Sequence, residues 1–168
     1  MSTEYSHFDP ILLDFFQTHS LPFDYYEHPP LFTVEDSEKY GVHIPWVHTK
    51  NLFLTDKKWN FYLLSVEWSK RVALNQFRKQ LWVKDLSFWS PEQLREYLAL
   101  TPWSVSLMGL LTWKGRVKCY IDKDLWQSEC IGVHPNRNDA TIVLSHDCLC
   151  KIFALWNIEV EVVEVPVL

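Results

Sequence analysis

The sequence predicts one compact domain of the α/β or α+β class. Three observations favour this class: short strand-like runs alternate with several short helical segments, 48% of the 168 residues are hydrophobic, and no repeat or linker divides the chain. A chain of this length buries roughly two thirds of its unfolded surface, so its core needs no disulfide or metal for stability. We therefore expect residues 1–168 to form a single domain.

The N-terminal part of the chain begins with helix and strand signals. Asp9 followed by Pro10 is typical of a helix N-terminus, with Asp9 as the N-cap and the proline in the first turn. The segment 21–28 that follows has a strand-like composition. Thr33 precedes two acidic residues and is expected to cap a short helix that ends near Tyr40.

A hairpin and a further helix follow. The apolar runs 50–55 and 59–66 are separated by Asp-Lys-Lys, which indicates two antiparallel strands joined by a turn. The segment 76–82 is expected to form a short helix.

The second half contains two more capped helices. Ser90 before Pro91, with glutamine at the third helical position, predicts a helix that ends near residue 100. Ser145 is the expected N-cap of a last helix that Asn157 ends. Further strand material is expected at 117–121, around 131, at 141–144 and at 158–162.

Several functional classes are excluded by missing motifs. The four glycines cannot be arranged as a dinucleotide-binding loop or a Walker A loop, and neither H-E-x-x-H nor G-x-S-x-G occurs. No apolar run approaches the roughly 20 residues that cross a bilayer, and the polar N-terminus does not resemble a signal peptide. The four cysteines lack framework spacing, so we expect free thiols and a cytoplasmic location, with no membrane partner.

The charge is unevenly distributed along the chain. Residues 1–38 hold eight acidic residues and no basic one, whereas residues 39–151 hold all 16 lysines and arginines against ten acidic residues. A polyanion could therefore bind a basic face of a protein whose net charge is −5. The alternative is that mixed charges only solvate the surface. The candidates for phosphate contacts are Lys57-Lys58, Lys70-Arg71 and Arg78-Lys79.

Two segments carry residues suited to chemistry. Lys50 stands at the start of an apolar strand, where its ammonium group is expected to be partly desolvated; the alternative is an edge lysine that discourages aggregation. The segment 134–141 concentrates hydrogen-bonding side chains between two strands, and Pro135 favours an extended backbone at His134. A purely structural loop remains the alternative, because Asn and Asp commonly form turns.

Other candidates have simpler explanations. Cys148 and Cys150 with His146 invite a metal site, but the two cysteines would lie about 200° apart on a helix, so we expect no metal. Cys119 or Cys130 could serve as a nucleophile, although nothing marks either thiol as activated. The tryptophans in loop-like stretches are suited either to stacking on a base or to covering the core; they are Trp46, Trp103 and Trp113.

Taken together, six segments resemble the YbaK/ProX family, whose members are free-standing relatives of the editing domain in bacterial prolyl-tRNA synthetase. The similarity is greatest to its alanyl-tRNA(Pro) deacylase branch and extends from about residue 10 to 165. The segments are Thr33-Val34-Glu35, Lys50-Asn51-Leu52-Phe53-Leu54, Leu86-Ser87-Phe88, Leu100-Thr101-Pro102, Asp122-Lys123-Asp124-Leu125 and His134-Pro135-Asn136-Arg137-Asn138-Asp139-Ala140-Thr141.

This resemblance implies a mixed, barrel-like sheet flanked by short helices and hydrolysis of a wrong amino acid from tRNA(Pro), without metal, cofactor or enzyme nucleophile. A prolyl-tRNA synthetase is an implied further partner. By the same resemblance, Lys50 holds the aminoacyl group electrostatically with Asn51 beside it. His134 stands at the pocket mouth, and Asn138 and Thr141 maintain the shape of its loop.

The chain departs from the family in the loop after Thr-Pro, which is normally Gly-x-x-x-Pro and lines the aminoacyl pocket. Here Trp103 and Ser104 begin the matching stretch, and Leu107 replaces the proline. Either the pocket is remodelled for another small residue (Ser, Thr or Cys), or Trp103 turns outward, or the site is closed. The alternatives to an alanine-specific deacylase are therefore a deacylase for another residue and an inactive module that binds tRNA or synthetase; an unrelated thiol enzyme is a third hypothesis.

Overall fold

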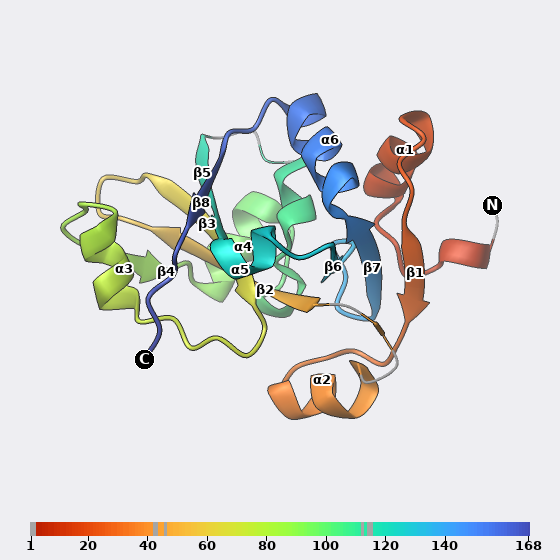
Figure 1. The fold of residues 1–168 in the computed structure, drawn as a ribbon, viewed down its shortest axis with the longest axis horizontal. Coiled ribbons are helices and arrows are strands. Elements are labelled where there is room, and N and C mark those ends of the chain that lie inside the picture. Colours follow the sequence, from red (N-terminus) through yellow and green to blue (C-terminus); the bar gives the residue numbers. More distant parts are fainter. Residues whose placement is uncertain (1–2, 42–43, 46, 112, 114–115) are drawn as a thin grey trace.

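The computed structural model describes residues 1–168 except 1–2, 42–43, 46, 112 and 114–115 (Figure 1). Eight strands form one mixed sheet with the order β1-β7-β6-β2-β3-β5-β8, and β4 pairs with β2. The strands are β1 (Asp24–Glu27), β2 (Val47–Thr55), β3 (Phe61–Glu67), β4 (Ser87–Phe88), β5 (Val117–Asp122), β6 (Cys130–Val133), β7 (Ala140–Ser145) and β8 (Val160–Val163). This arrangement confirms the predicted class.

Short helices surround the sheet. They are α1 (Pro10–Thr18), α2 (Val34–Gly41), α3 (Leu74–Gln80), α4 (Pro91–Leu98), α5 (Lys123–Trp126) and α6 (His146–Trp156), with 3-10 turns at Thr3–Tyr5, Pro102–Ser104 and Leu107–Leu111. The predicted caps are present: Asp9 accepts the backbone N–H of Ile11, and Ser145 accepts that of Cys148. Ser90 forms the expected capping box with the third helical residue.

Strand β2 joins the two halves of the sheet. Its first residues pair in parallel with β6, with His48 opposite Gly132, and the rest of the strand pairs antiparallel with β3, with Lys50 opposite Val66. Because successive side chains of a strand point to opposite faces, β2 contributes to both sides of the sheet.

The two faces carry separate hydrophobic clusters. Side chains of α1, α4 and α6 pack on one face around Phe53 and Leu63, and Phe77 of α3 packs on the other face against Leu54 and Leu64. Leu63 and Leu64 are neighbours in β3, so the strand alternation separates the two clusters.

Some expectations need correction. β1 is shorter than the expected segment 21–28: its ladder with β7 extends only from Asp24, opposite Val143, to Glu27, opposite Ala140, which is the first residue of β7. The helix α5 and the strand β4 were not expected. Trp113 is not available for stacking on a base, because its ring packs against Phe53, Phe61 and Trp89; Trp46 lies outside the described residues.

Candidate functional site

A narrow cavity of about 10 Å³ lies where β2, β6 and β7 meet beneath the segment that follows β1. Its lining includes Leu31, His48, Trp68, Gly132, His134 and Thr141. A space of this size holds about one water molecule. An aminoacyl group therefore requires movement of the lining.

The strand registers explain why these residues meet. His48 of β2 lies opposite Gly132 of β6, and the β6–β7 ladder continues toward His134 and Thr141 on the same face. A methyl group at Gly132 would lie 3.2 Å from the Thr141 side chain and 3.6 Å from His48 Nδ1, so glycine permits this close approach.

The electrostatics of His134 define its protonation state. Its Nδ1 lies 3.1 Å from the carbonyl oxygen of Ala140, which can only accept a hydrogen bond. Burial lowers the pKa of His134 to about 4, and the neighbouring His28 and His48 act in the same direction. The imidazole is therefore neutral at pH 7 with its proton on Nδ1, which leaves Nε2 as a hydrogen-bond acceptor.

His28 is a functional candidate that the sequence analysis missed. Its Nδ1 donates to the Pro29 carbonyl over 2.9 Å, and its Nε2 lies 2.9 Å from Thr141 Oγ1. In this tautomer the Thr141 hydroxyl donates to His28. The rings of His28 and His134 are 6.2 Å apart between centroids, so His28 lies behind a lining that includes His48, His134 and Thr141.

Trp68 is the second missed residue. Its backbone N–H donates to the His48 carbonyl, and its indole Nε1 is buried without a hydrogen-bond partner in the described part of the chain. A buried donor without a partner is costly, and Trp68 lines the cavity, so this N–H is a candidate donor once the lining moves to admit a ligand. The sequence offered no signal for it, because nine tryptophans occur and most are expected in the core.

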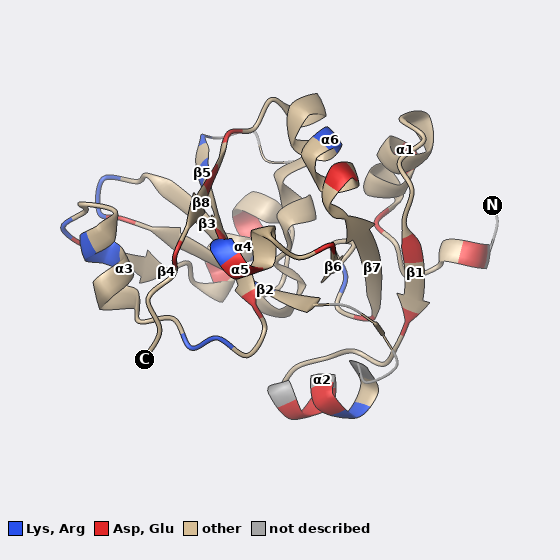
Figure 2. Ribbon diagram, viewed as in Figure 1, with Lys and Arg blue, Asp and Glu red and all other residues tan. Residues whose placement is uncertain are grey.

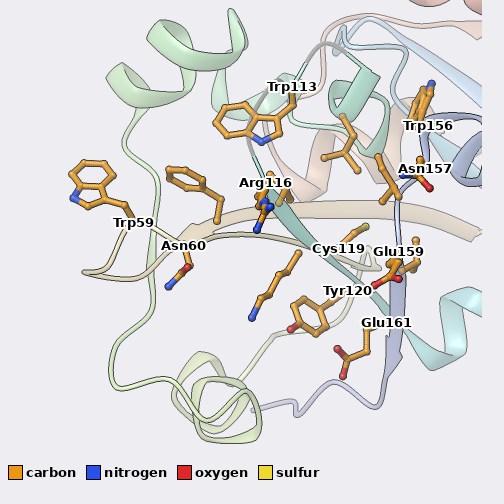
Figure 3. A pocket seen from close by; sticks show the side chains of 16 residues that line it. Trp59, Asn60, Trp113, Arg116, Cys119, Tyr120, Trp156, Asn157, Glu159 and Glu161 are labelled. Carbon is orange, nitrogen blue, oxygen red and sulfur yellow. The ribbon is translucent and has the colours of Figure 1, made fainter.

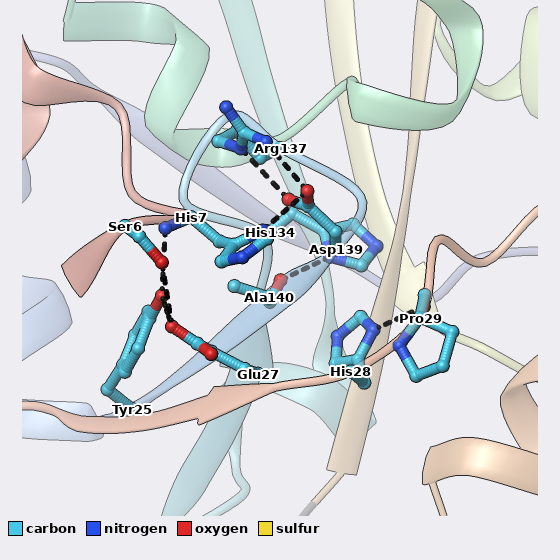
Figure 4. Close-up of polar contacts among 10 residues, drawn as sticks. All are labelled: Ser6, His7, Tyr25, Glu27, His28, Pro29, His134, Arg137, Asp139 and Ala140. Carbon is cyan, nitrogen blue, oxygen red and sulfur yellow. Dashed lines mark hydrogen bonds and ion pairs between the residues drawn. The ribbon is translucent and has the colours of Figure 1, made fainter. Parts of the chain in front are cut away.

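The loop that carries His134 is held by charged hydrogen bonds (Figure 4). Arg137 donates twice to Asp139, over 2.9 and 2.7 Å, and His7 Nδ1 lies 2.6 Å from the same carboxylate. The Arg137 guanidinium holds the pKa of Asp139 far below its usual range. Asn138 holds the other side of this loop, because its backbone carbonyl accepts the N–H of Leu31 over 3.1 Å.

Replacing Asp139 by asparagine is expected to lower the free energy of unfolding at pH 7 by about 1–3 kcal/mol. A carboxylate with a lowered pKa stabilises the fold above its unfolded pKa of about 4, and that contribution is lost as the pH falls further. The difference between wild type and variant should therefore shrink between pH 7 and pH 3, measured by thermal melting. Asp14→Asn, on the exposed side of α1, is the control; an equal shift in both variants would contradict the assignment.

Lys50 lies near the cavity but does not line it. It is two residues beyond His48 on the same face of β2, and its Nζ donates to the Lys70 carbonyl over 2.5 Å. Burial lowers the pKa of Lys50. Lys70 in turn pairs with Asp122 and Asp124, each over 2.6 Å.

The other predicted site residues lie apart from the cavity lining. Asn51 faces the opposite side of β2, where its Oδ1 accepts from Ser65 over 2.6 Å. Its Nδ2 is buried, with no partner among the residues described. Trp103 turns outward with 53% of its surface exposed, edge-on to Phe32, and Ser104 bonds within its own turn.

The environments of the cysteines do not activate the two thiols considered as nucleophiles, since burial raises the pKa of both Cys119 and Cys130. Burial raises the pKa of Cys119 to about 12 and that of Cys148 to about 11, so both thiols are protonated at neutral pH. Within the described ranges, no group of three or more His, Cys, Asp or Glu side chains is placed to hold a metal ion.

A larger, open groove of about 1520 Å³ lies at the far end of the sheet (Figure 3). Trp59, Arg116 and Lys118 are among its lining residues, and Glu159 and Glu161 come from β8 and the residue before it. Its mixed charges and open shape offer no convergent catalytic group.

No helix in the described part of the chain has the length and apolar character needed to cross a bilayer.

Comparisons with known proteins place the cavity residues in a known domain. The sequence profile of the aminoacyl-tRNA editing domain matches residues 28–152. The prolyl-tRNA editing protein ProX of Acetoanaerobium sticklandii is 38% identical over 128 residues, 75% of this chain and 78% of that protein. Prolyl-tRNA synthetase associated domain-containing protein 1 of Mus musculus is 34% identical over 124 residues, 71% of this chain and 73% of that protein.

The fold agrees with this relationship. A crystal structure described as a proposed trans-editing enzyme for prolyl tRNA synthetase superposes with a TM-score of 0.68 at 16% sequence identity. The superposition covers 94% of this chain and 97% of that one.

Proposed function

Because this chain belongs to the aminoacyl-tRNA editing domain family, we propose that it hydrolyses mischarged aminoacyl-tRNA, with alanine on tRNA(Pro) as its substrate. The observation that carries the proposal is that Lys50 and His134 lie on one face of the sheet beside a cavity lined by hydrogen-bonding groups. The proposed location is the cytoplasm. The proposed partners are tRNA(Pro) and a prolyl-tRNA synthetase.

The proposed chemistry is direct attack of water on the ester carbonyl. The bond from the carbonyl carbon to the ribose oxygen breaks, the amino acid leaves with the water oxygen, and the ribose oxygen gains a proton. An ester is reactive enough for orientation and charge stabilisation to suffice, so no metal, cofactor or enzyme nucleophile is invoked.

The residues have distinct proposed roles. Lys50 leaves the Lys70 carbonyl and stabilises the negative charge that develops on the carbonyl oxygen, with the Trp68 indole N–H as a second donor. The neutral His134 accepts a hydrogen bond through Nε2 and orients water or the terminal ribose. Thr141 and Asn138 maintain the loop, and Asn51 supports β2 from the opposite face.

Size is the proposed basis of specificity. The aminoacylation site of a synthetase distinguishes amino acids that differ by one methylene by only about 1–3 kcal/mol of binding free energy. A second, narrower site is therefore needed to hydrolyse the smaller amino acid from the tRNA. The lining must move to admit any aminoacyl group, and the bulky walls formed by Leu31 and Trp68 make the smaller movement that alanine needs more favourable than the larger one for proline. Serine, threonine and cysteine are the alternative residues.

A second candidate function is a binding module without hydrolytic activity. The 10 Å³ cavity and the contact of Lys50 with Lys70 favour it, as does Trp103 at the position where the family's loop has glycine. Such a module binds acylated tRNA but releases no amino acid.

The deciding experiment measures release of amino acid from Ala-tRNA(Pro), Ser-tRNA(Pro) and Pro-tRNA(Pro) beside an enzyme-free control. We expect fast release of alanine and no release of proline. Release of serine alone would preserve the chemistry but overturn the alanine assignment. No release from any substrate would overturn the deacylase in favour of the binding module.

The same assay with Trp103→Gly tests whether the loop limits access. Because the native side chain points outward, we expect the variant to keep the alanine-releasing activity of the wild type. If glycine converted an inert protein into a deacylase, the native pocket would be closed.

A further inference from the structure

The turn between β2 and β3 and the segment after α3 form one continuous surface at the end of the molecule opposite α2. The backbone N–H of Lys57 donates to the Asp85 carboxylate. The Arg78 guanidinium donates to the carbonyls of Val83 and Lys84. The bond from Lys57 to Asp85 joins the two segments, and the Arg78 bonds hold the segment after α3 in place. We call this surface the basic end and define it by Lys57, Lys58, Trp59, Lys79, Trp82 and Lys84.

The cations of the basic end are exposed and lack acidic partners. Among the residues that the structure describes, the side-chain ammonium groups of its four lysines form no ion pair with a carboxylate within 4.0 Å. The nearby acids are already engaged, since Asp56 is buried and accepts hydrogen bonds from Tyr62 and Asn60, and Asp85 accepts the N–H described above. The four lysines and Arg78 outnumber these two carboxylates, so the surface carries a net positive charge.

Two tryptophans project from the same surface. Trp82 is 94% exposed and Trp59 is 61% exposed. Both have a left-handed backbone, with φ of 58° and 60°, a conformation that costs non-glycine residues about 1 kcal/mol or more. Packing does not account for an indole in such a position. Exposed aromatic rings among lysines are instead suited to stacking on nucleic-acid bases between phosphate contacts.

We propose that the basic end binds the tRNA body while the acylated 3′ end occupies the cavity. The inference rests on the proposed function and adds a second contact surface to it. Strand β2 runs from His48 at the cavity to Thr55 at the basic end, a distance of about 23 Å at roughly 3.3 Å per residue. Acidic residues gather on α2, which follows the cavity residue Leu31 along the chain, and lysines and arginines gather around α3 and the neighbouring turn (Figure 2). A polyanion anchored in the cavity is thus directed away from α2 and toward the basic end.

The test measures the dissociation constant for uncharged tRNA(Pro) over a range of salt concentrations. The variants are the doubles Lys57→Gln/Lys58→Gln and Lys79→Gln/Lys84→Gln. Each is expected to weaken binding by about 10-fold and to reduce the slope of log K on log salt by about 1.5, because each phosphate contact contributes about 0.7–0.9. The matched control is Lys123→Gln/Lys151→Gln, whose exposed lysines lie on other elements, and its binding should change less than about twofold.

The aromatic contribution has its own variants. Trp82→Ala should weaken binding by about 5- to 100-fold if a base stacks on the indole, and Trp82→Phe should retain most of the affinity. In the hydrolysis assay these variants should raise KM and leave kcat unchanged. Because the Trp82 side chain is exposed, the thermal midpoint of both variants should stay that of the wild type.

The outcomes separate this inference from the proposed function. If the wild type releases amino acid and all basic-end variants bind tRNA like the wild type, the surface proposal is overturned while the deacylase stands. If the variants lose tRNA binding but the wild type releases nothing, the surface is supported and the deacylase fails. If the variants lose binding to phosphatidylserine vesicles and keep their affinity for tRNA, the surface binds anionic membrane, and the proposal is wrong.

Discussion

Hydrolysis by the Lys50→Met variant should be at least about 100-fold slower in kcat/KM than by the wild type, because removing one preorganised donor to a developing oxyanion costs about that much. Methionine keeps the apolar stem and removes the ammonium group. The only described contact of Nζ is with the Lys70 carbonyl. The thermal midpoint should therefore change little.

The pH profile gives a second readout for Lys50. Burial lowers the pKa of its amine, so activity that needs the ammonium form is present below that pKa and is lost as the pH rises through it. Lys50→Arg keeps the charge at all accessible pH values, so its residual activity should lack this alkaline loss. Lys151→Met on α6 is the control for the loss of one surface charge. Full activity in Lys50→Met would overturn the assignment.

The His134→Gln variant is expected to lose activity by about 10²-fold, because the amide cannot reproduce the basicity of Nε2. In the wild type the imidazole is already neutral at pH 5, since its pKa is about 4. The rate between pH 5 and 8 should therefore show no inflection from this residue. An inflection near pH 6.5 that disappears in the variant would contradict the burial of the ring.

The same pKa predicts a stability effect. The folded-state pKa of about 4 lies below the unfolded value of about 6.5, so the unfolded chain binds the proton first and stability falls as the pH drops from 6.5 to 4. The full loss is at most about 3 kcal/mol. Urea unfolding at pH 7 and pH 4.5 should show this loss in the wild type but not in His134→Gln, and His19→Gln, on an exposed residue, should behave like the wild type.

Local structure was predictable because its causes lie within a few residues. The caps at Asp9, Ser90 and Ser145 depend on side chains that bond the next helical turn, and the β2–β3 turn depends on adjacent residues. The strand β4 and the helix α5 were missed, because each is too short to show the hydrophobic periodicity by which strands and helices are recognised in a sequence.

The candidate site was predictable only in part. Lys50 stood out because it opens an otherwise apolar run, and His134 because Pro135 follows it in a segment rich in hydrogen-bonding side chains; the resemblance gave both their proposed roles. His28, His48 and Trp68 were missed. Alternation along β2 puts His48 on the same face as Lys50, which was the one available signal. Nothing local connects His28 with Thr141, because 113 residues separate them.

The sequence by itself determined the class of fold, the helix caps, the hairpin and the segments that resemble an editing domain, because each depends on local side-chain chemistry or on the order of motifs. Only the tertiary structure decided which face of β2 each residue occupies, that Trp103 points outward and that Lys50 contacts Lys70. Those outcomes depend on the parallel pairing of β2 with β6 and on packing between distant segments. Strand register and burial are set by contacts across the whole chain, so a local pattern does not contain them.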